Sequence, residues 1–217
     1  ITQMIAGGII SPADALQLLG LEETPWPMAV RRERFGLNFD RLPARAARPG
    51  TAGVVCVNPN NPTGTVYPAD EVRALVGLCR ERDWVLYYDE VYRLLAFGGE
   101  APLHPFQVEG GRERTIVVGS FSKLFGMTGW RVGYLIAPPE VLRQVLKVQD
   151  TTLICAPVPG QRLAADCLRR FPDYPAAYRE ELRRRVALLG AVIRGIPGLH
   201  WRQPSGALFT MIGYEGD

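Results

Sequence analysis

Lys123 is conspicuous because the chain uses almost no lysine. Lys123 and Lys147 are the only lysines among its 25 lysine and arginine residues. A guanidinium cannot form a Schiff base with a carbonyl compound, whereas a deprotonated lysine amine can. Lys123 also lies in a segment, SFSKLFGMTGWR, that follows directly on a short β-rich run. We therefore take Lys123 as the first candidate for covalent chemistry with a carbonyl group.

Other polar side chains fall at or just beyond the ends of predicted strands. Asp89 ends the run WVLYYD, and Ser120 and Ser122 follow the run TIVVG. In open α/β sheets ligands bind at the carboxyl ends of the strands, so polar residues drawn from three strands predict a shared site. The remaining members of this set are Asn61, Tyr92 and Lys123.

The chemistry of this set fits the needs of pyridoxal 5'-phosphate (PLP). Its aldehyde requires a lysine amine, its ring nitrogen an anion, and its phosphate hydroxyl, N–H and arginine donors. Asp89 can supply the anion, and Asn61 and Tyr92 can donate hydrogen bonds to the phenolic oxygen of the ring. The predicted phosphate donors are Ser120, Ser122 and Arg131.

The elements that position these residues alternate between strand and helix from about residue 52. A helix opening at Pro68 has Val72, Leu75, Val76 and Cys79 on one face. This alternation predicts an α/β fold with a mostly parallel sheet and helices on both faces. The link from 119 to 131 is short and Gly-rich, so we expect the fourth strand to run antiparallel. The four predicted strands are Ala52–Val57, Trp84–Tyr88, Thr115–Gly119 and Val132–Ala137.

Three helices and two strands are predicted after the fourth strand, and the two strands form part of a second, unfinished unit. Helices are expected at 139–149, 161–170 and 174–194, the last bounded by prolines at its start and by Gly195 and Pro197 at its end. Strands are expected at 199–202 and 207–212.

Composition narrows the class of protein. An apolar fraction of 47% and a charged fraction of 22% are typical of a globular protein. The net charge of +3 is spread among balanced arginines and glutamates, which argues against nucleic acid as a partner. The apolar runs are too short to predict a membrane span, and the first ten residues do not resemble a signal peptide. The four cysteines are expected to be reduced, as in the cytoplasm.

Three segments, VNPNNPTG, YYDEVY and SFSKLFGMTGWRVGY, resemble in order and spacing the signature blocks of the class I/II aminotransferases of PLP fold type I. From about residue 16 to 217 the chain is similar to this family. The resemblance implies a PLP-dependent transfer of an amino group from an amino acid to a 2-oxo acid, and a homodimer of the full-length protein. Other fold-type I activities (lyase, synthase or oxidase) are alternatives, as is a non-catalytic fragment or the sensor half of a PLP-fold transcription regulator.

The resemblance also implies roles for single residues. Lys123 forms the Schiff base with the cofactor and then acts as acid and base. Asp89 pairs with the ring nitrogen, Tyr92 contacts the phenolic oxygen, and Asn61 contacts that oxygen and the substrate carboxylate. Ser120, Ser122 and Arg131 bind the phosphate. Thr2 and Gln3, in ITQMI, would add phosphate donors.

Two of these residues also admit a simpler reading. Asp89 is a suitable N-cap for a helix in EVYRLL, and Asn61 in NPTG is a common turn residue. Family chains are longer than this one, so we expect a PLP-binding large domain over 1–171, incomplete at its N-terminal side. The connecting helix and part of a small C-terminal domain follow over 172–217.

Overall fold

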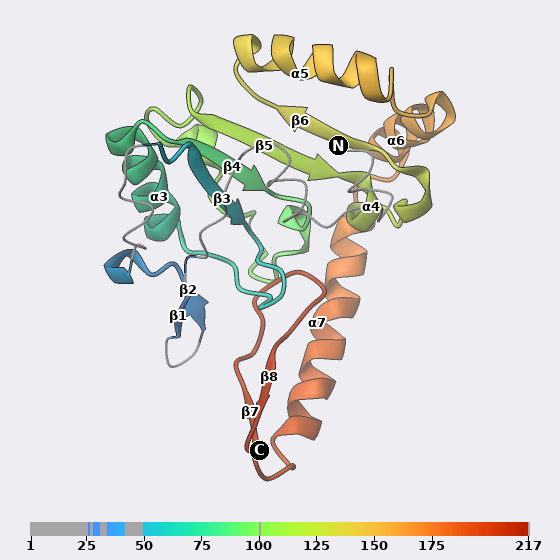
Figure 1. Cartoon of the computed structure of the whole chain (residues 1–217). Helices are drawn as coiled ribbons and strands as arrows, with labels where there is room; N and C mark the ends of the chain where they lie inside the picture. Colours follow the sequence, from blue (N-terminus) through green and yellow to red (C-terminus); the bar gives the residue numbers. More distant parts are fainter. Residues whose placement is uncertain (1–25, 27, 31–33, 42–49, 100, 217) are drawn as a thin grey trace.

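The computed structural model describes residues 26, 28–30, 34–41, 50–99 and 101–216. Its centre is a four-stranded sheet in the order β3-β4-β5-β6 (Figure 1). The first three strands are parallel to one another, and β6 is antiparallel to β5. The mostly parallel sheet and the reversed fourth strand are therefore confirmed. Their bounds are Gly53–Val57 for β3, Val85–Asp89 for β4, Thr115–Ser120 for β5 and Gly133–Ile136 for β6.

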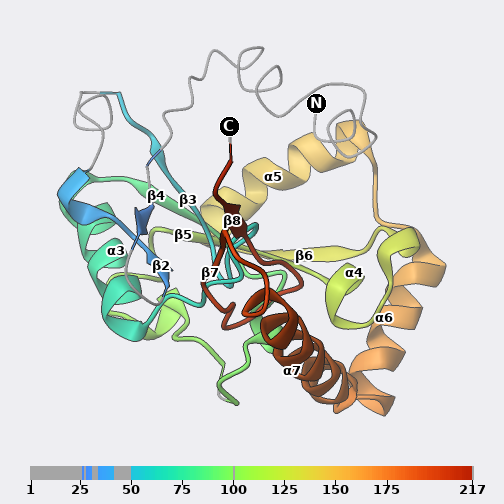
Figure 2. The same ribbon diagram turned by 90° about the horizontal axis from the view of Figure 1, so that it is seen from below.

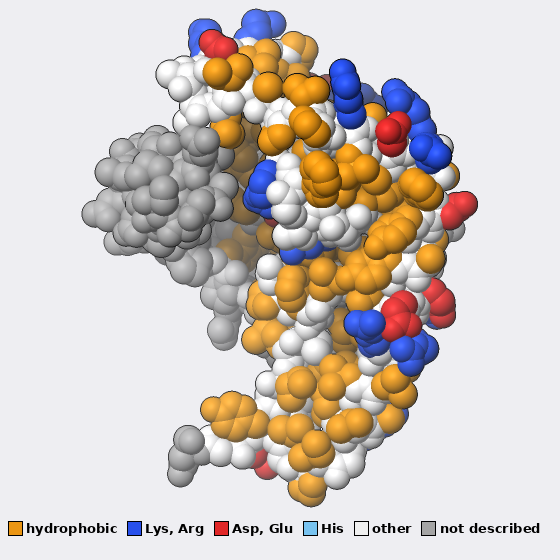
Figure 3. All heavy atoms as spheres, turned by 90° about the vertical axis from the view of Figure 1, so that its right-hand side faces the viewer, with side chains coloured by type: hydrophobic (Ala, Val, Ile, Leu, Met, Phe, Trp, Pro, Cys, Tyr) orange, Lys and Arg blue, Asp and Glu red, His pale blue; other side chains and the backbone are white. Residues whose placement is uncertain are grey.

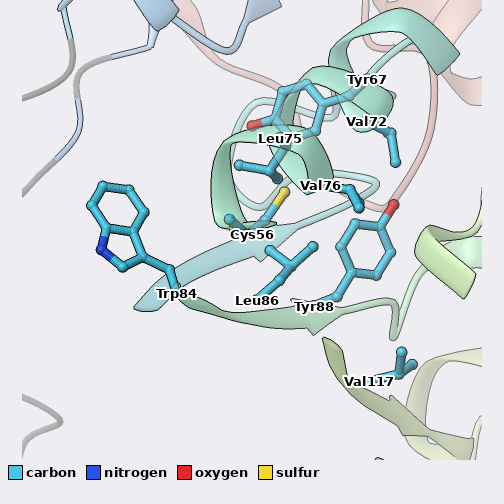
Figure 4. Packing of buried hydrophobic residues seen from close by; sticks show 10 residues of the cluster. Cys56, Tyr67, Val72, Leu75, Val76, Trp84, Leu86, Tyr88 and Val117 are labelled. Carbon is cyan, nitrogen blue, oxygen red and sulfur yellow. The ribbon is translucent and has the colours of Figure 1, made fainter. Parts of the chain in front are cut away.

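Helix α3, Ala69–Arg82, covers one face of this sheet. Acidic residues in its first turn and arginines in its last turn complement the helix dipole. Its predicted apolar face is buried against alternate residues of the strands, as Figure 4 shows for Leu86, Tyr88 and Val117. Successive strand residues point to opposite faces, so these side chains share the α3 side. On the other face Val55 is 73% exposed and Tyr87 42%.

The remaining helices follow the sheet in sequence. They are α4 Phe121–Leu124, α5 Pro139–Thr152, α6 Val158–Arg170 and α7 Tyr174–Ile193. Helix α7 extends away from the sheet, and the antiparallel pair of β7 (Leu199–Trp201) and β8 (Ile212–Tyr214) lies beside it (Figures 1 and 2). The pair packs on α7 where the Trp201 ring meets Gly190, since a Cβ there would come within 2.6 Å of the ring.

Short elements complete the described chain. Strands β1 (Ala29–Val30) and β2 (Phe35–Gly36) form a small antiparallel pair. Four 3-10 turns are η1 Phe39–Arg41, η2 Arg93–Leu95, η3 Pro105–Gln107 and η4 Thr128–Trp130.

The strand expected over 207–212 is wrong, because β8 begins only at Ile212. The preceding residues form a turn that packs on other loops instead of pairing as a strand. The N–H groups of Ser205 and Gly206 both donate to the carbonyl of Gly64, at 2.8 and 2.9 Å, and Ala207 N–H donates to the carbonyl of Leu95. A tertiary contact thus overrides the local β pattern.

The surface carries many apolar side chains. Figure 3 shows them spread along the side of the molecule formed by α6 and α7. Leu168, Phe171, Leu188 and Val192 are each more than half exposed. Within the part of the chain that the structure describes, no helix is long and apolar enough to cross a membrane.

Candidate active site

The carboxyl ends of β3, β4 and β5 meet at one edge of the sheet, as expected for parallel strands. The ladder continues past the strands: Asn58 N–H donates to the carbonyl of Asp89, and Glu90 N–H donates to that of Val118, both at 2.9 Å. At the end of β5, Ser120 lies opposite Gly133 of β6. The loops that follow these three strands therefore begin side by side.

Asp89 is the acidic group at this edge. It is half-buried, and its Oδ1 accepts a hydrogen bond from the N–H of Val91 at 3.0 Å. Burial raises the pKa of the Asp89 carboxyl; the Val91 N–H opposes this, and the charge of Glu90 adds to it. The side chain caps its own loop, whereas the N-cap position of η2 is Tyr92. A cation beside Asp89 would offset the desolvation of its charge.

Tyr92 lies close to Asp89. Burial raises the pKa of its phenol, and the charge of Asp89 raises it further. The ring is 5% exposed and meets Phe209 edge to face, with centroids 5.3 Å apart. It packs in the same apolar cluster as Leu124, the residue after Lys123. The loop after β4 and helix α4 are thus in one packed unit.

Lys123 lies in α4, whose start is fixed by Ser120. The Ser120 Oγ accepts a hydrogen bond from the N–H of Ser122 at 3.1 Å and caps the helix. Lys123 is half-buried, and among the described residues its amine has no hydrogen bond or ion pair. A lysine that is held by its neighbours while its amine is free is suited to react with a ligand.

Arg131 reaches the same edge from the start of β6. The Thr128 hydroxyl donates to the carbonyl of Ser122 at 3.2 Å, which ties η4 to α4. Arg131 itself has φ 55°, a left-handed conformation uncommon outside glycine, and its guanidinium donates to the carbonyl of Thr128. Its side chain is exposed. Two hydroxyls and a guanidinium near Lys123 form a set able to bind phosphate.

The turn after β3 assigns different tasks to its three asparagines. Asn60 makes the turn: its Oδ1 accepts from the Thr63 hydroxyl at 2.8 Å, and its carbonyl accepts from Gly64 N–H. Asn61 is exposed, and in the described part of the chain its side chain has no hydrogen bond. The turn chemistry therefore falls to Asn60, and Asn61 is left available to a ligand.

Asn58 is a supporting residue that the sequence reasoning missed. It is 1% exposed; its Nδ2 donates to the Tyr88 hydroxyl at 2.7 Å, and its Oδ1 accepts from Tyr67 N–H at 3.0 Å. It fixes the start of the turn that carries Asn61. The alternation of Tyr88 with Leu86 on the α3 face could have indicated that Tyr88 needs a buried partner.

Glu90 was also missed. It directly follows Asp89 and is 4% exposed. Its carboxylate accepts from the Tyr134 hydroxyl at 3.0 Å, and it lies 3.3 Å from His104 Nε2 and 3.5 Å from Arg93 Nε. Neither Tyr134 nor His104 was among the residues that the sequence predicts for the site. Thr2 and Gln3 lie outside the described residues.

Comparisons with known proteins point to one family. The family model described as "Aminotransferase class I and II" matches residues 13–217. An aspartate/prephenate aminotransferase of Thermus thermophilus is 33% identical over 95% of this chain and 50% of its own length. An aspartate aminotransferase of Musicola paradisiaca is 38% identical over 73% of this chain and 40% of its own.

Among solved structures, N-succinyldiaminopimelate aminotransferase of Mycobacterium tuberculosis superposes with a TM-score of 0.82 at 30% identity. The match covers 88% of this chain and 50% of that one. The chain thus spans half or less of the length of these relatives.

Proposed function

This chain belongs to the class I and II aminotransferase family, whose members use PLP, and on that premise we propose that it carries the lysine-bearing part of a PLP site. The intact protein whose active site includes this chain transfers an amino group from an amino acid to a 2-oxo acid. The residues proposed to act are Lys123, Asp89, Tyr92, Asn61, Ser120, Ser122 and Arg131.

Polar groups of the described residues that are left available to a ligand match the functional groups of the cofactor. The Lys123 amine and the Asn61 amide have no partner among the described residues, and Asp89 has one oxygen bonded to Val91. Each of these groups has a complement on PLP: the aldehyde for the amine, the phenolic oxygen for the amide, and the protonated ring nitrogen for the carboxylate. Burial raises the pKa of Asp89, and a protonated ring nitrogen beside it would oppose that shift.

The residues would divide the work as follows. Lys123 holds the cofactor covalently and, once released by the substrate amine, moves a proton at the substrate α-carbon. Asp89 holds a proton on the ring nitrogen. Ser120, Ser122 and Arg131 bind the phosphate and thereby orient the ring. When bound, PLP supplies the electron sink that stabilises negative charge at the α-carbon.

The observation that carries the proposal is a half-buried lysine with a free amine beside a capped serine turn. Its test is to mix the chain with PLP, reduce with borohydride and map the labelled peptide. We expect a visible absorption band and a single label on Lys123. The matched control is Lys147, which is exposed on α5 and donates to Gln144 at 3.0 Å. Lys147→Ala should keep the band, and Lys123→Ala should lose it.

A label on Lys147, or a band that survives in Lys123→Ala, would contradict the assignment. Product assays then separate the activities. Ketone formation that requires an added 2-oxo acid supports amino transfer, whereas ketone formation without one indicates a lyase or oxidase.

The wider organisation is part of the same proposal. We place a large PLP-binding domain up to residue 171 and a connecting helix with part of a small domain from 172 onward. The exposed apolar side chains on α6 and α7 support a homodimer of the intact protein. The four cysteines are unpaired, which supports a cytoplasmic location.

A further inference from the structure

The loop that carries Asp89 and Tyr92 is held from the opposite face of the sheet by Glu90. Residues 86, 88 and 90 alternate onto the α3 side, where Leu86 and Tyr88 belong to the apolar core. Glu90 is therefore a buried carboxylate at the rim of that core, directly next to Asp89 in sequence. A carboxylate in such a place is retained only with partners.

Side chains from three different elements converge on Glu90: Tyr134 donates a hydrogen bond to its carboxylate, and His104 and Arg93 lie within 3.5 Å of it. Tyr134 comes from β6, His104 from the N-cap of η3, and Arg93 from η2. Their side chains are largely buried, with 13% exposure for His104 and 31% for Arg93. The loop between β4 and η2 is thus tied to two other parts of the fold by one side chain.

The protonation of His104 follows from its second nitrogen. Nδ1 accepts a hydrogen bond from the N–H of Phe106 at 3.1 Å, so Nδ1 carries no proton. The proton of the neutral imidazole is then on Nε2, which faces Glu90. His104 Nε2 lies 3.3 Å from Glu90 Oε2, and Arg93 Nε lies 3.5 Å from the same oxygen, so a guanidinium stands beside this carboxylate.

The Tyr134 contact depends on a glycine. Tyr134 lies opposite Gly119 on the neighbouring strand, and a Cβ on Gly119 would come within 2.0 Å of the Tyr134 ring. The ring therefore crosses β5 at Gly119 to bring its hydroxyl to Glu90, the residue after the end of β4. Only glycine at this position leaves room for the ring.

From these contacts we infer that Glu90 is a positioning residue for the cofactor site: with Tyr134, His104 and Arg93 it fixes the segment 89–92, and so sets Asp89 and Tyr92 toward the cofactor. This inference rests on the proposed function. Glu90 touches neither cofactor nor substrate. Two N–H groups of this segment make hydrogen bonds whose strength can be followed by amide hydrogen exchange. Glu90 N–H donates to the carbonyl of Val118, and Val91 N–H donates to Asp89 Oδ1.

The test uses Glu90→Gln and Tyr134→Phe in the whole chain. Glutamine keeps the size but removes the charge and one acceptor oxygen at the point where Tyr134, His104 and Arg93 meet, and phenylalanine keeps the ring over Gly119 but removes the hydroxyl that donates. Amide hydrogen exchange at Glu90 and Val91 should become faster in both variants. The affinity for PLP, titrated by absorbance, should fall by about tenfold in Glu90→Gln, as expected when a buried charged hydrogen-bond partner is removed, and by less in Tyr134→Phe.

The control for general loss of stability is Val76→Ala, in the α3 core and 3% exposed. At a matched fraction folded, Val76→Ala should keep the native exchange at these two amides and the native affinity. A Glu90→Gln protein that binds PLP as tightly as the native chain, or no more weakly than Val76→Ala, overturns the positioning role. If the native chain forms no adduct with PLP at Lys123, the proposed function itself is wrong. This outcome is observed with the native chain alone, so it is distinguishable from a failure of the positioning role.

Discussion

Asp89 and Glu90 are neighbours in the chain, yet their carboxylates lie in two regions with different surroundings. On the α3 side Glu90, Tyr88 and Asn58 all bond to other side chains. At the carboxyl edge of the sheet, Lys123 and Asn61 have free polar groups among the described residues. Groups that satisfy one another serve the fold, whereas groups that are held in place but left free can serve a ligand.

The difference between these two regions predicts that the largest effect follows a substitution at the carboxyl edge of the sheet. Asp89→Asn removes the charge proposed to keep the ring nitrogen protonated, so amino transfer should fall by about a thousandfold, about 4 kcal/mol in the barrier. The free energy of unfolding should be unchanged or slightly higher, because a desolvated charge is removed. Single-turnover kinetics and urea titration measure the two quantities. If Asp89→Asn lowered the free energy of unfolding as much as a substitution in the apolar core does, Asp89 would serve the fold in the same way as the core residues.

The second largest effect is expected on the face of the sheet that α3 covers. Leu75 is 0% exposed, and Leu75→Ala should lower the free energy of unfolding by about 3 kcal/mol through lost burial and a cavity. The folded fraction should still form the reduced adduct at Lys123. Leu146→Ala on α5, where the side chain is 60% exposed, is the control and should leave stability nearly native. Loss of the adduct at full folding would show that the core also shapes the site.

A smaller effect should appear in the dependence of stability on pH. Burial raises the pKa of Asp89 above its ordinary value of 3.8, so the folded state binds this proton more tightly than the unfolded state. The contribution of Asp89 is then fully present below pH 3.8 and is lost as pH rises through the raised pKa. The difference in unfolding free energy between the native chain and Asp89→Asn, measured against pH, should change only in that window. An opposite slope would mean that Asp89 is stabilised as an anion in the ligand-free chain.

The smallest effect is expected on the exposed face of α7. Arg184 and Arg185 both bond to Glu181, and together they hold the pKa of this carboxyl at about 2. Both arginines are exposed and Glu181 is partly exposed, and water and salt screen such pairs. Arg184→Ala should therefore leave the unfolding midpoint within experimental error. A clear shift of the midpoint would show that this face is covered in solution.

Much of the fold was predictable because its signals are local. The apolar runs predicted β3, β4 and β5, and the spacing of Val72, Leu75 and Cys79 predicted the buried face of α3. The short link after Gly119 predicted the reversal of β6. The turn at 205–207 was not predictable, since its conformation depends on the carbonyls of Gly64 and Leu95, which are distant in sequence.

The site divides in the same way. Asp89, Lys123 and Asn61 could be named from motif and strand position, and the structure places all three at the carboxyl edge. Their chemical roles stay predictions. Glu90 and Asn58 could not be assigned, because their partners Tyr134 and Tyr88 are recognised only when the register of the sheet is known.

The antiparallel turn from β5 into β6 has an evolutionary consequence. Since β6 runs back along β5, Lys123 at the end of one strand and Arg131 before the start of the next are encoded within a single short stretch of the gene. The residues proposed for covalent attachment and for phosphate binding are therefore inherited together and cannot be separated by recombination outside that stretch. An insertion there would displace both functions at once, whereas Asp89 and Asn61, on separate loops, can vary independently. Selection on cofactor binding should thus restrict length variation most strongly between residues 120 and 133.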